Sequence, residues 1–329
     1  NKKSYYSEYY DEIVDRWKNS RYDVVLLAYH EMGILGNSSR RTELLKLLKR
    51  NSNKLIWLDT KDSTGSCEFE VLEYVDRYLK KQILRDLDLY KKNYYGDRVF
   101  TDFYRRQNGV TDELFDSMKP MAALENKYIE KIGVSWNIGL NEQYGMTGDD
   151  KEKYTDKFKE WNFHDEYHEK KYDLHYKVTI HDAAISFQRK KIRDFLLEMQ
   201  NVNMPDMDKK VPYDEYIDEF MDSKAVISPF GWGEICFRDF DAFSYGIALV
   251  KPDMSHLVTY PDWYIDGETC IEFAWDFSDF KEKINYICQK ENTNRIMKIA
   301  KNGQNLFKKM HGEYGKKAFV RHLIEEIKI

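Results

Sequence analysis

Apolar runs and amphipathic stretches alternate in the first part of the chain. Residues 22–28 form a compact run rich in β-forming residues, and residues 54–59 form a second one. Between them, residues 40–50 carry leucines at helical spacing. Short apolar runs bounded by polar residues are typical of strands covered on both faces in a parallel sheet. A strand-helix-strand unit with a right-handed crossover is therefore predicted, with both strands in one parallel sheet.

The pattern weakens toward the middle of the chain and then resumes. Residues 68–92 are predicted to be helical, residues 131–137 to form a strand, and the polar stretch 141–170 to separate two lobes. The second half alternates again. Its predicted strands are 176–180, 225–228 and 246–250, and its predicted helices are 186–200, 212–222, 278–290, 292–310 and 315–327.

This alternation predicts an α/β protein with two Rossmann-like, doubly wound lobes that face a cleft. The predicted N-terminal lobe comprises residues 1–165 and the C-terminal lobe residues 166–310. Residues 311–329 are predicted as a terminal helix that packs back on the N-terminal lobe. A length of 329 residues agrees with two lobes, because single hydrophobic cores stop growing at roughly 250–300 residues.

Composition excludes some classes of function and indicates a cellular compartment. The net charge is −5, whereas non-specific nucleic-acid binding needs a basic surface, so no nucleic-acid partner is expected. Four scattered cysteines show neither zinc spacing nor a disulfide framework, which predicts a reduced, cytoplasmic protein. No apolar run approaches the roughly 20 residues of a membrane span, and residues 1–6 lack a signal-peptide core. Peripheral contact with a membrane is left open.

The segment 228–250 carries the most informative pattern. It reads as a strand end at Ser228, a loop with Gly231 and Gly233, a helix, a glycine stop and a second strand. Glycines let a backbone approach a ligand closely, and free N–H groups at a helix N-terminus bind phosphate. This segment is therefore a candidate phosphate site.

Charged residues in the same segment add to this interpretation. Glu234, Arg238 and Asp241 stand at positions i, i+4 and i+7, which lie on one face of a helix. The arginine could meet a diphosphate, and the carboxylates could accept hydroxyl groups of a sugar or ribose. The alternative is an ordinary solvated face with weak i,i+4 ion pairs.

The segment resembles the donor-site pattern of GT-B glycosyltransferases, including the exostosin-like and bacterial-type glycan-synthesis families. In the usual form of that pattern two glutamates lie eight positions apart. Here Glu234 is followed by Asp241, one position short, or by Asp239 in the exostosin-like register. The resemblance is specific over roughly residues 212–264. It implies that the C-terminal lobe binds a nucleotide-sugar and the N-terminal lobe a glycan or glycolipid acceptor.

Further candidates lie outside this segment. A basic cluster on the predicted helix 186–200 contains Arg189 and Arg193, which share a face and could bind donor phosphates. His30, in the loop after the first strand, is a candidate general base, because ligands of such sheets lie beyond the carboxyl ends of the strands. Asp59 and Asp62, after the second strand, are its rivals.

The leading hypothesis is metal-independent glycosyl transfer, with Glu234 also a catalytic candidate. No Asp-x-Asp pattern of a metal-dependent enzyme is present between apolar strands, so neither a metal nor another cofactor is expected. Aromatic residues make up 15% of the chain, which fits sugar recognition and equally a bulky core. A sugar-nucleotide epimerase on the same fold, and a non-catalytic glycan-binding or scaffold protein, remain open alternatives.

Overall fold

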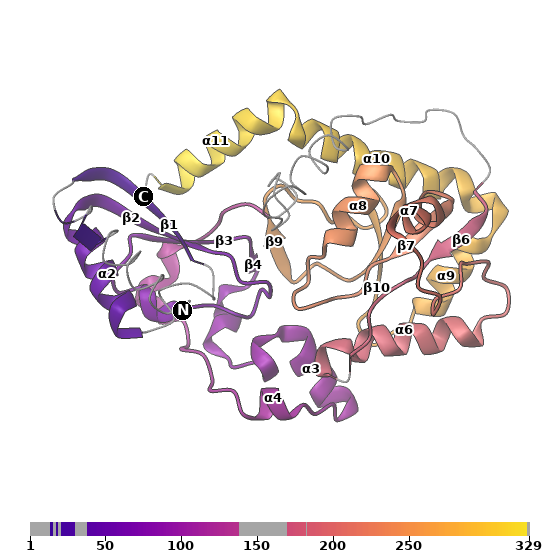
Figure 1. The fold of residues 1–329 in the computed structure, drawn as a ribbon, viewed down its shortest axis with the longest axis horizontal. Helices are drawn as coiled ribbons and strands as arrows, with labels where there is room; N and C mark the ends of the chain where they lie inside the picture. Colours follow the sequence, from indigo (N-terminus) through magenta and orange to yellow (C-terminus); the bar gives the residue numbers. More distant parts are fainter. Residues whose placement is uncertain are drawn as a thin grey trace.

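The computed structural model describes residues 14–15, 18, 21–29, 38–137, 170–181 and 183–327. The predicted lobe boundary at residue 165 and the candidate His30 lie outside the described residues. Two parallel sheets, each with its own helices, lie at opposite ends of the molecule (Figure 1). We call the parts built around them the N-terminal and C-terminal lobes.

The sheet of the N-terminal lobe has four parallel strands in the order β1-β2-β3-β5. The strands are β1 (Tyr22–Tyr29), β2 (Ser52–Asp59), β3 (Arg77–Lys80) and β5 (Ile132–Val134). Side chains alternate between the two faces of a strand, and β2 is buried along most of its length. Both faces must therefore be covered.

Two helices from distant parts of the sequence cover those faces. Leucines of α2 (Ser38–Arg50) pack against the face that carries Leu55 and Trp57. Leu323 of α11 (Glu313–Ile327) packs against the opposite face, beside Ile56. In Figure 1 α11 runs from the C-terminal lobe back across the top of the molecule to the N-terminal sheet.

Polar contacts fix the end of α11 on this sheet. Arg77 pairs with the Glu326 carboxylate and also donates to the Glu326 carbonyl oxygen at 2.7 Å. A ring nitrogen of His322 lies 2.7 Å from the carbonyl oxygen of Val134. The last helix therefore belongs to the core of the first sheet, although the two are far apart in sequence.

The sheet of the C-terminal lobe also has four parallel strands, in the order β10-β8-β7-β6. They are β6 (Tyr172–His175), β7 (Ser223–Ile227), β8 (Ala248–Pro252) and β10 (Cys270–Phe273). Four of the five residues of β7, all but Lys224, and all five of β8 are buried, as expected for strands with helices on both faces.

Helices enclose this sheet on both sides. Side chains of α6 (Phe187–Glu198), α9 (Phe280–Cys288) and the first turns of α10 (Thr293–His311) pack on the face of Ala225 and Ile227. Side chains of α8 (Phe237–Tyr245) and the last turns of α10 pack on the other face. The remaining helical elements are α3 (Val99–Asn108), α4 (Glu113–Asp116), α7 (Tyr213–Met221), and 3-10 turns at Phe69–Val71, Leu87–Lys91, Tyr95–Asp97, Asn126–Lys131, Ala184–Ser186 and Lys290–Asn292.

Several contacts join the two lobes. A two-stranded antiparallel sheet pairs β4 (Gln82–Leu84), which follows β3, with β9 (Leu257–Thr259), which follows β8. Helix α3 comes from the first half of the chain, yet Phe100 and Tyr104 are buried in the core around α8. The Tyr104 hydroxyl accepts a hydrogen bond from Gln188 of α6 at 2.8 Å. The two lobes are therefore packed together over a broad contact.

The α/β class with parallel sheets is confirmed, and three details differ from the expectation. Residues 68–92 are not a helix, because they contain β3 and β4 between short turns. The strand predicted at 176–180 lies earlier, at β6. Among the described strands, the order runs in one direction across each sheet, without the reversal that defines a doubly wound sheet.

Candidate functional site

A pocket of about 300 Å³ lies where the carboxyl ends of strands from both sheets meet. Asp62 follows β2, Lys81 and Gln82 follow β3, and Asn137 follows β5. The C-terminal lobe supplies Arg189 of α6 and residues 231–233 and 235–238, which follow β7. Ligands of parallel α/β sheets bind outside the carboxyl ends of strands, so this is the expected place for one.

The two glycines of the loop are explained by close packing. A Cβ atom on Gly233 would lie 2.0 Å from the carbonyl oxygen of Asp62, and one on Gly231 would lie 2.9 Å from Arg189 Nη2. The first clash is with backbone of the opposite lobe, so no other residue fits at Gly233 without a shift of one lobe. We predicted that these glycines admit a ligand. At Gly233 the space is filled by Asp62, while the pocket opens beside it.

Glu234 does not share a helix face with Arg238 and Asp241, which corrects the predicted row. Helix α8 begins at Phe237 after Cys236, so Glu234 lies in the preceding loop. The helix starts there because the Asp239 carboxylate accepts a hydrogen bond from the Cys236 backbone N–H at 3.0 Å. It ends at Gly246, in the left-handed conformation at φ 66°, as the predicted glycine stop requires.

The Glu234 carboxylate instead crosses to the N-terminal lobe. It is fully buried and accepts hydrogen bonds from the Thr64 backbone N–H at 2.8 Å and from Ser63 Oγ at 3.3 Å. His256 Nε2 lies 4.0 Å away, and burial lowers the pKa of His256 although the nearby carboxylate opposes this shift. Glu234 is outside the pocket lining, and its contacts are those of a link between lobes.

Ser228 belongs to a second buried network behind the pocket. Its Oγ donates to Asp239 Oδ1 at 2.5 Å, and its exposed fraction is zero. Lys251 Nζ lies 2.9 Å from Asp239 Oδ2, and the Tyr264 hydroxyl donates to the same oxygen at 2.8 Å. Ser228 is enclosed by this network and is outside the pocket lining, so its predicted donor contact stays a prediction.

Arg189 and Arg238 are the two guanidinium groups on the pocket wall. Arg189 donates to the carbonyl oxygens of Phe230 at 3.0 Å and Thr179 at 2.7 Å. Arg238 donates from Nη2 to the Lys177 carbonyl oxygen at 2.9 Å, and its buried Nε has no hydrogen-bond partner among the described residues. Burial lowers the pKa of Arg189, and the charge of Arg238 acts in the same direction.

These two cations stand at the N-terminal end of α8, whose first residues also line the pocket. Free N–H groups of a helix N-terminus favour anions, and guanidinium groups form strong hydrogen bonds with phosphate. On the opposite wall Lys81 pairs with Asp62 at 3.2 Å, so it is the wall with Arg189 and Arg238 that has the chemistry of an anion site.

Asp241, one turn further along α8, is outside the pocket lining. Burial raises its pKa to about 7, an effect that Arg238 opposes and Asp239 strengthens. Its protonation state therefore bears on Arg238 from behind the pocket wall.

The remaining predicted residues lie elsewhere. Arg193 is partly exposed, pairs with Asp208 at 2.6 Å and does not line the pocket. Asp59 is buried beside Lys80 at 3.2 Å and accepts a hydrogen bond from the Lys61 backbone N–H at 2.7 Å. Of the two aspartates after β2, it is Asp62 that lines the pocket.

Sequence reasoning missed Lys81, Gln82, Asn137, Trp232 and Phe237, which all line the pocket. Lys81 and Gln82 were hidden because their region was predicted as a helix, although polar residues that directly follow a buried strand would have marked them. Trp232 lies between the two glycines of the candidate loop, and that position could have identified it. Within the described ranges, no group of three or more His, Cys, Asp or Glu could hold a metal ion, and metal independence stays a prediction.

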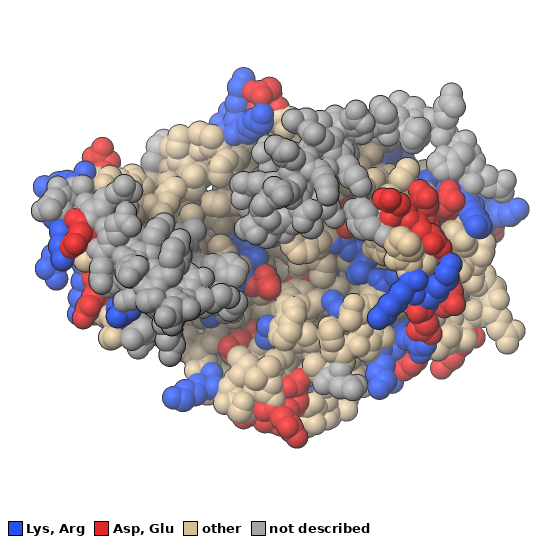
Figure 2. Space-filling model, viewed as in Figure 1, with Lys and Arg blue, Asp and Glu red and all other residues tan. Residues whose placement is uncertain are grey.

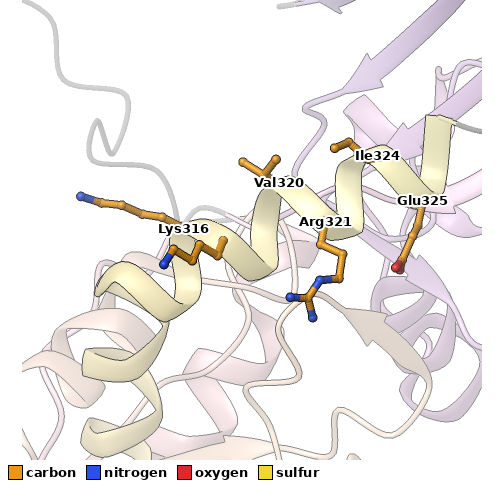
Figure 3. Close-up of a pocket in the computed structure, with 6 residues that line it drawn as sticks. Lys316, Val320, Arg321, Ile324 and Glu325 are labelled. Carbon is orange, nitrogen blue, oxygen red and sulfur yellow. The ribbon is translucent and has the colours of Figure 1, made fainter.

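Another, larger pocket of about 520 Å³ lies along α11. Its described lining comes from this helix, with Lys316, Val320, Arg321, Ile324 and Glu325 among its residues (Figure 3). Its described lining comes from one helix and shares no residue with the pocket at the strand ends, so we do not assign the candidate site there. On the face shown in Figure 2, acidic and basic side chains are mixed and form no continuous basic surface outside the grey atoms.

No protein-family model matches the chain, and no curated protein matches its sequence. Among solved structures, the chain is similar to Anabaena Alr3699/HepE in complex with UDP-glucose, with 10% sequence identity and a TM-score of 0.41 over 96% of this chain and 82% of that one. At this TM-score we transfer neither fold nor residue roles. Within the described residues, no helix is long and apolar enough to cross a membrane.

Proposed function

We propose that the chain is a GT-B-type glycosyltransferase that binds a nucleotide-sugar in the pocket between its lobes and transfers the sugar to a glycan or glycolipid acceptor. The observation that carries this proposal is the pair Arg189 and Arg238 beside the N-terminus of α8, at the carboxyl ends of both sheets. The diphosphate of the donor would bind at these groups.

The same groups serve the chemistry. The new bond joins an acceptor oxygen to the anomeric carbon, while the bond from that carbon to the phosphate oxygen breaks. Negative charge develops on the leaving diphosphate, and Arg189 and Arg238 stabilise it without a metal ion. We assign the acceptor proton to Asp62, whose carboxylate is 62% exposed on the opposite wall of the pocket.

Glu234 and Asp59 receive no catalytic role in this proposal, because their carboxylates are buried in protein contacts. His30 remains a predicted general base outside the described residues. Ser228 is enclosed by protein, and Arg193 pairs with Asp208 outside the pocket lining, so the proposed donor site includes neither residue.

Calorimetry with UDP, GDP, CMP and dTDP in the presence of EDTA tests the anion site. The wild type is expected to bind one of them. Arg238→Ala should weaken that nucleotide by about 10- to 100-fold, because hydrogen bonds to charged groups contribute roughly 1.5–3 kcal/mol. Arg193→Ala is the matched control, since its guanidinium pairs with Asp208 away from the pocket.

Equal affinity of Arg238→Ala and wild type would refute the assignment of this pocket, provided that both proteins unfold at the same temperature. Loss of all binding in EDTA would refute metal independence. Once the nucleotide is known, incubation with its sugar conjugate separates the enzyme classes. Transfer or slow hydrolysis indicates a transferase, while a changed sugar with an intact diphosphate bond indicates an epimerase.

A further inference from the structure

Trp232 is an exposed aromatic ring at the pocket. Its exposed fraction is 52%, whereas Trp57 and Trp263 are fully buried. It is part of the pocket lining, between the two glycines that fix the loop. Aromatic side chains are common in the lining of ligand pockets.

The position of this residue is fixed from the other lobe. Arg98, which directly precedes α3, donates from Nε to the Trp232 carbonyl oxygen at 2.7 Å. The same guanidinium lies over the indole ring at 5.3 Å from its centroid. One face of the ring is therefore covered, and a ligand can stack only on the other. A ring held in this way loses little conformational freedom when a ligand binds.

Groups that bind hydroxyls share the pocket with this ring. Asp62 and Lys81 pair at 3.2 Å, with the carboxylate largely exposed. Gln82 is 1% exposed, and its Oε1 has no hydrogen-bond partner in the described part of the chain. Its amide nitrogen donates to the Asp62 carbonyl oxygen, so the orientation of the side chain is set. Buried oxygen acceptors without partners are costly unless a ligand or water satisfies them.

We infer that Trp232 is the platform of a sugar subsite, on which the C–H face of a pyranose stacks while Asp62, Lys81 and Gln82 bind its hydroxyls. One open aromatic face combined with a carboxylate, an ammonium and an amide matches a ring that is apolar on its face and polar at its rim. That this sugar is the acceptor rests on the proposed function. The binding of a sugar at Trp232 does not.

A glycan array probed with the whole chain, followed by calorimetry with a retained oligosaccharide, tests the inference. The wild type should retain at least one glycan. Trp232→Ala should weaken it about tenfold, the order expected for loss of one aromatic stacking contact. Trp232→Phe should keep most of the affinity, because an aromatic face remains. Tyr314→Ala removes a ring that is 58% exposed on α11 and should change nothing.

Each outcome of these measurements either supports the sugar subsite or overturns it. Retention of no glycan by the wild type, or equal affinity of Trp232→Ala and wild type, overturns the inference. Loss of nucleotide affinity in Trp232→Ala with glycan affinity unchanged also overturns it, since the ring would then stack on a base. If the wild type binds no nucleotide but loses its glycan through Trp232→Ala, the sugar subsite stands and the transferase proposal fails.

Discussion

Arg238 and Asp239 are neighbours in sequence at the start of α8, and the structure gives them opposite surroundings. Asp239 is fully buried and receives hydrogen bonds from Ser228, Lys251 and Tyr264. Arg238 is only partly buried and lines the pocket, with one nitrogen lacking a partner among the described residues. Successive helical residues point about 100° apart, which is enough to separate a core group from a group that lines the pocket.

The comparison shows that residue type did not distinguish the two roles. All the charged residues of this segment are acids or arginines that could serve a sugar nucleotide. The two roles differ in whether the hydrogen-bond partners of the charged group all come from the protein. Asp239 has its partners in the core, so it supports the pocket from behind, whereas Arg238 lines the pocket.

The largest effect is expected where the buried network is broken. Lys251→Met keeps the length of the side chain but leaves the Asp239 carboxylate buried without its cation. Removal of one partner of a buried ion pair costs about 3–5 kcal/mol, so the free energy of unfolding should fall by that amount in urea denaturation. Lys91→Met, which breaks an exposed pair with Asp88, should cost less than about 1 kcal/mol. Similar losses for both variants would contradict the distinction between core and surface charges.

A smaller effect is expected where one buried carboxylate joins the lobes. Glu234→Gln removes the charge that the Thr64 N–H and Ser63 hydroxyl contact. The free energy of unfolding should fall by about 1–3 kcal/mol, as for other weakened buried hydrogen bonds to charged groups. Glu313→Gln, on the exposed start of α11, is the control. If Glu234→Gln were as stable as wild type but bound no nucleotide, Glu234 would be a ligand group, as the sequence suggested.

The smallest effect sharpens the role of Arg238 itself. Because burial raises the pKa of Asp241 to about 7, this carboxyl is neutral below that pH and charged above it. The charged form competes with a ligand anion for Arg238, so nucleotide affinity should fall a few-fold as the pH rises from 6 to 8. In Asp241→Asn this part of the pH dependence should vanish, while titration of the nucleotide remains. Parallel affinity profiles for the two proteins would show that Asp241 does not act on Arg238.

Stability should respond to the same group with a definite sign. The folded pKa of Asp241 lies above the ordinary value near 4, so the folded state binds the proton more strongly than the unfolded state does. This stabilising contribution is complete below about pH 4 and is lost as the pH rises toward 7. The difference in the free energy of unfolding between wild type and Asp241→Asn, measured by urea denaturation at several pH values, isolates the contribution of this carboxyl.

The sequence by itself determined the strands that are buried on both faces. Apolar runs at 54–59, 225–228 and 246–250 lie in or overlap strands enclosed by helices, because such a strand needs little else than consecutive apolar residues. The run at 22–28 also forms a strand, but among the described strands β1 lies at the edge of its sheet and exposes Val24 and Leu26, so its expected burial on both faces is wrong. The stop of α8 at Gly246 was equally local, since it depends on one left-handed residue. The short strands β3 and β4 escaped prediction, because three or four residues carry too weak a pattern.

Only the tertiary structure decided which side chains meet at the pocket. Glu234 looked like a ligand group until its partners Ser63 and Thr64 were found on the other lobe, some 170 positions away in sequence. Gly233 likewise owes its identity to the Asp62 backbone. Local patterns indicate which face of its own helix or strand a residue occupies. The hydrogen-bond partners of a buried charge come from distant parts of the chain, and spacing along the sequence does not encode them.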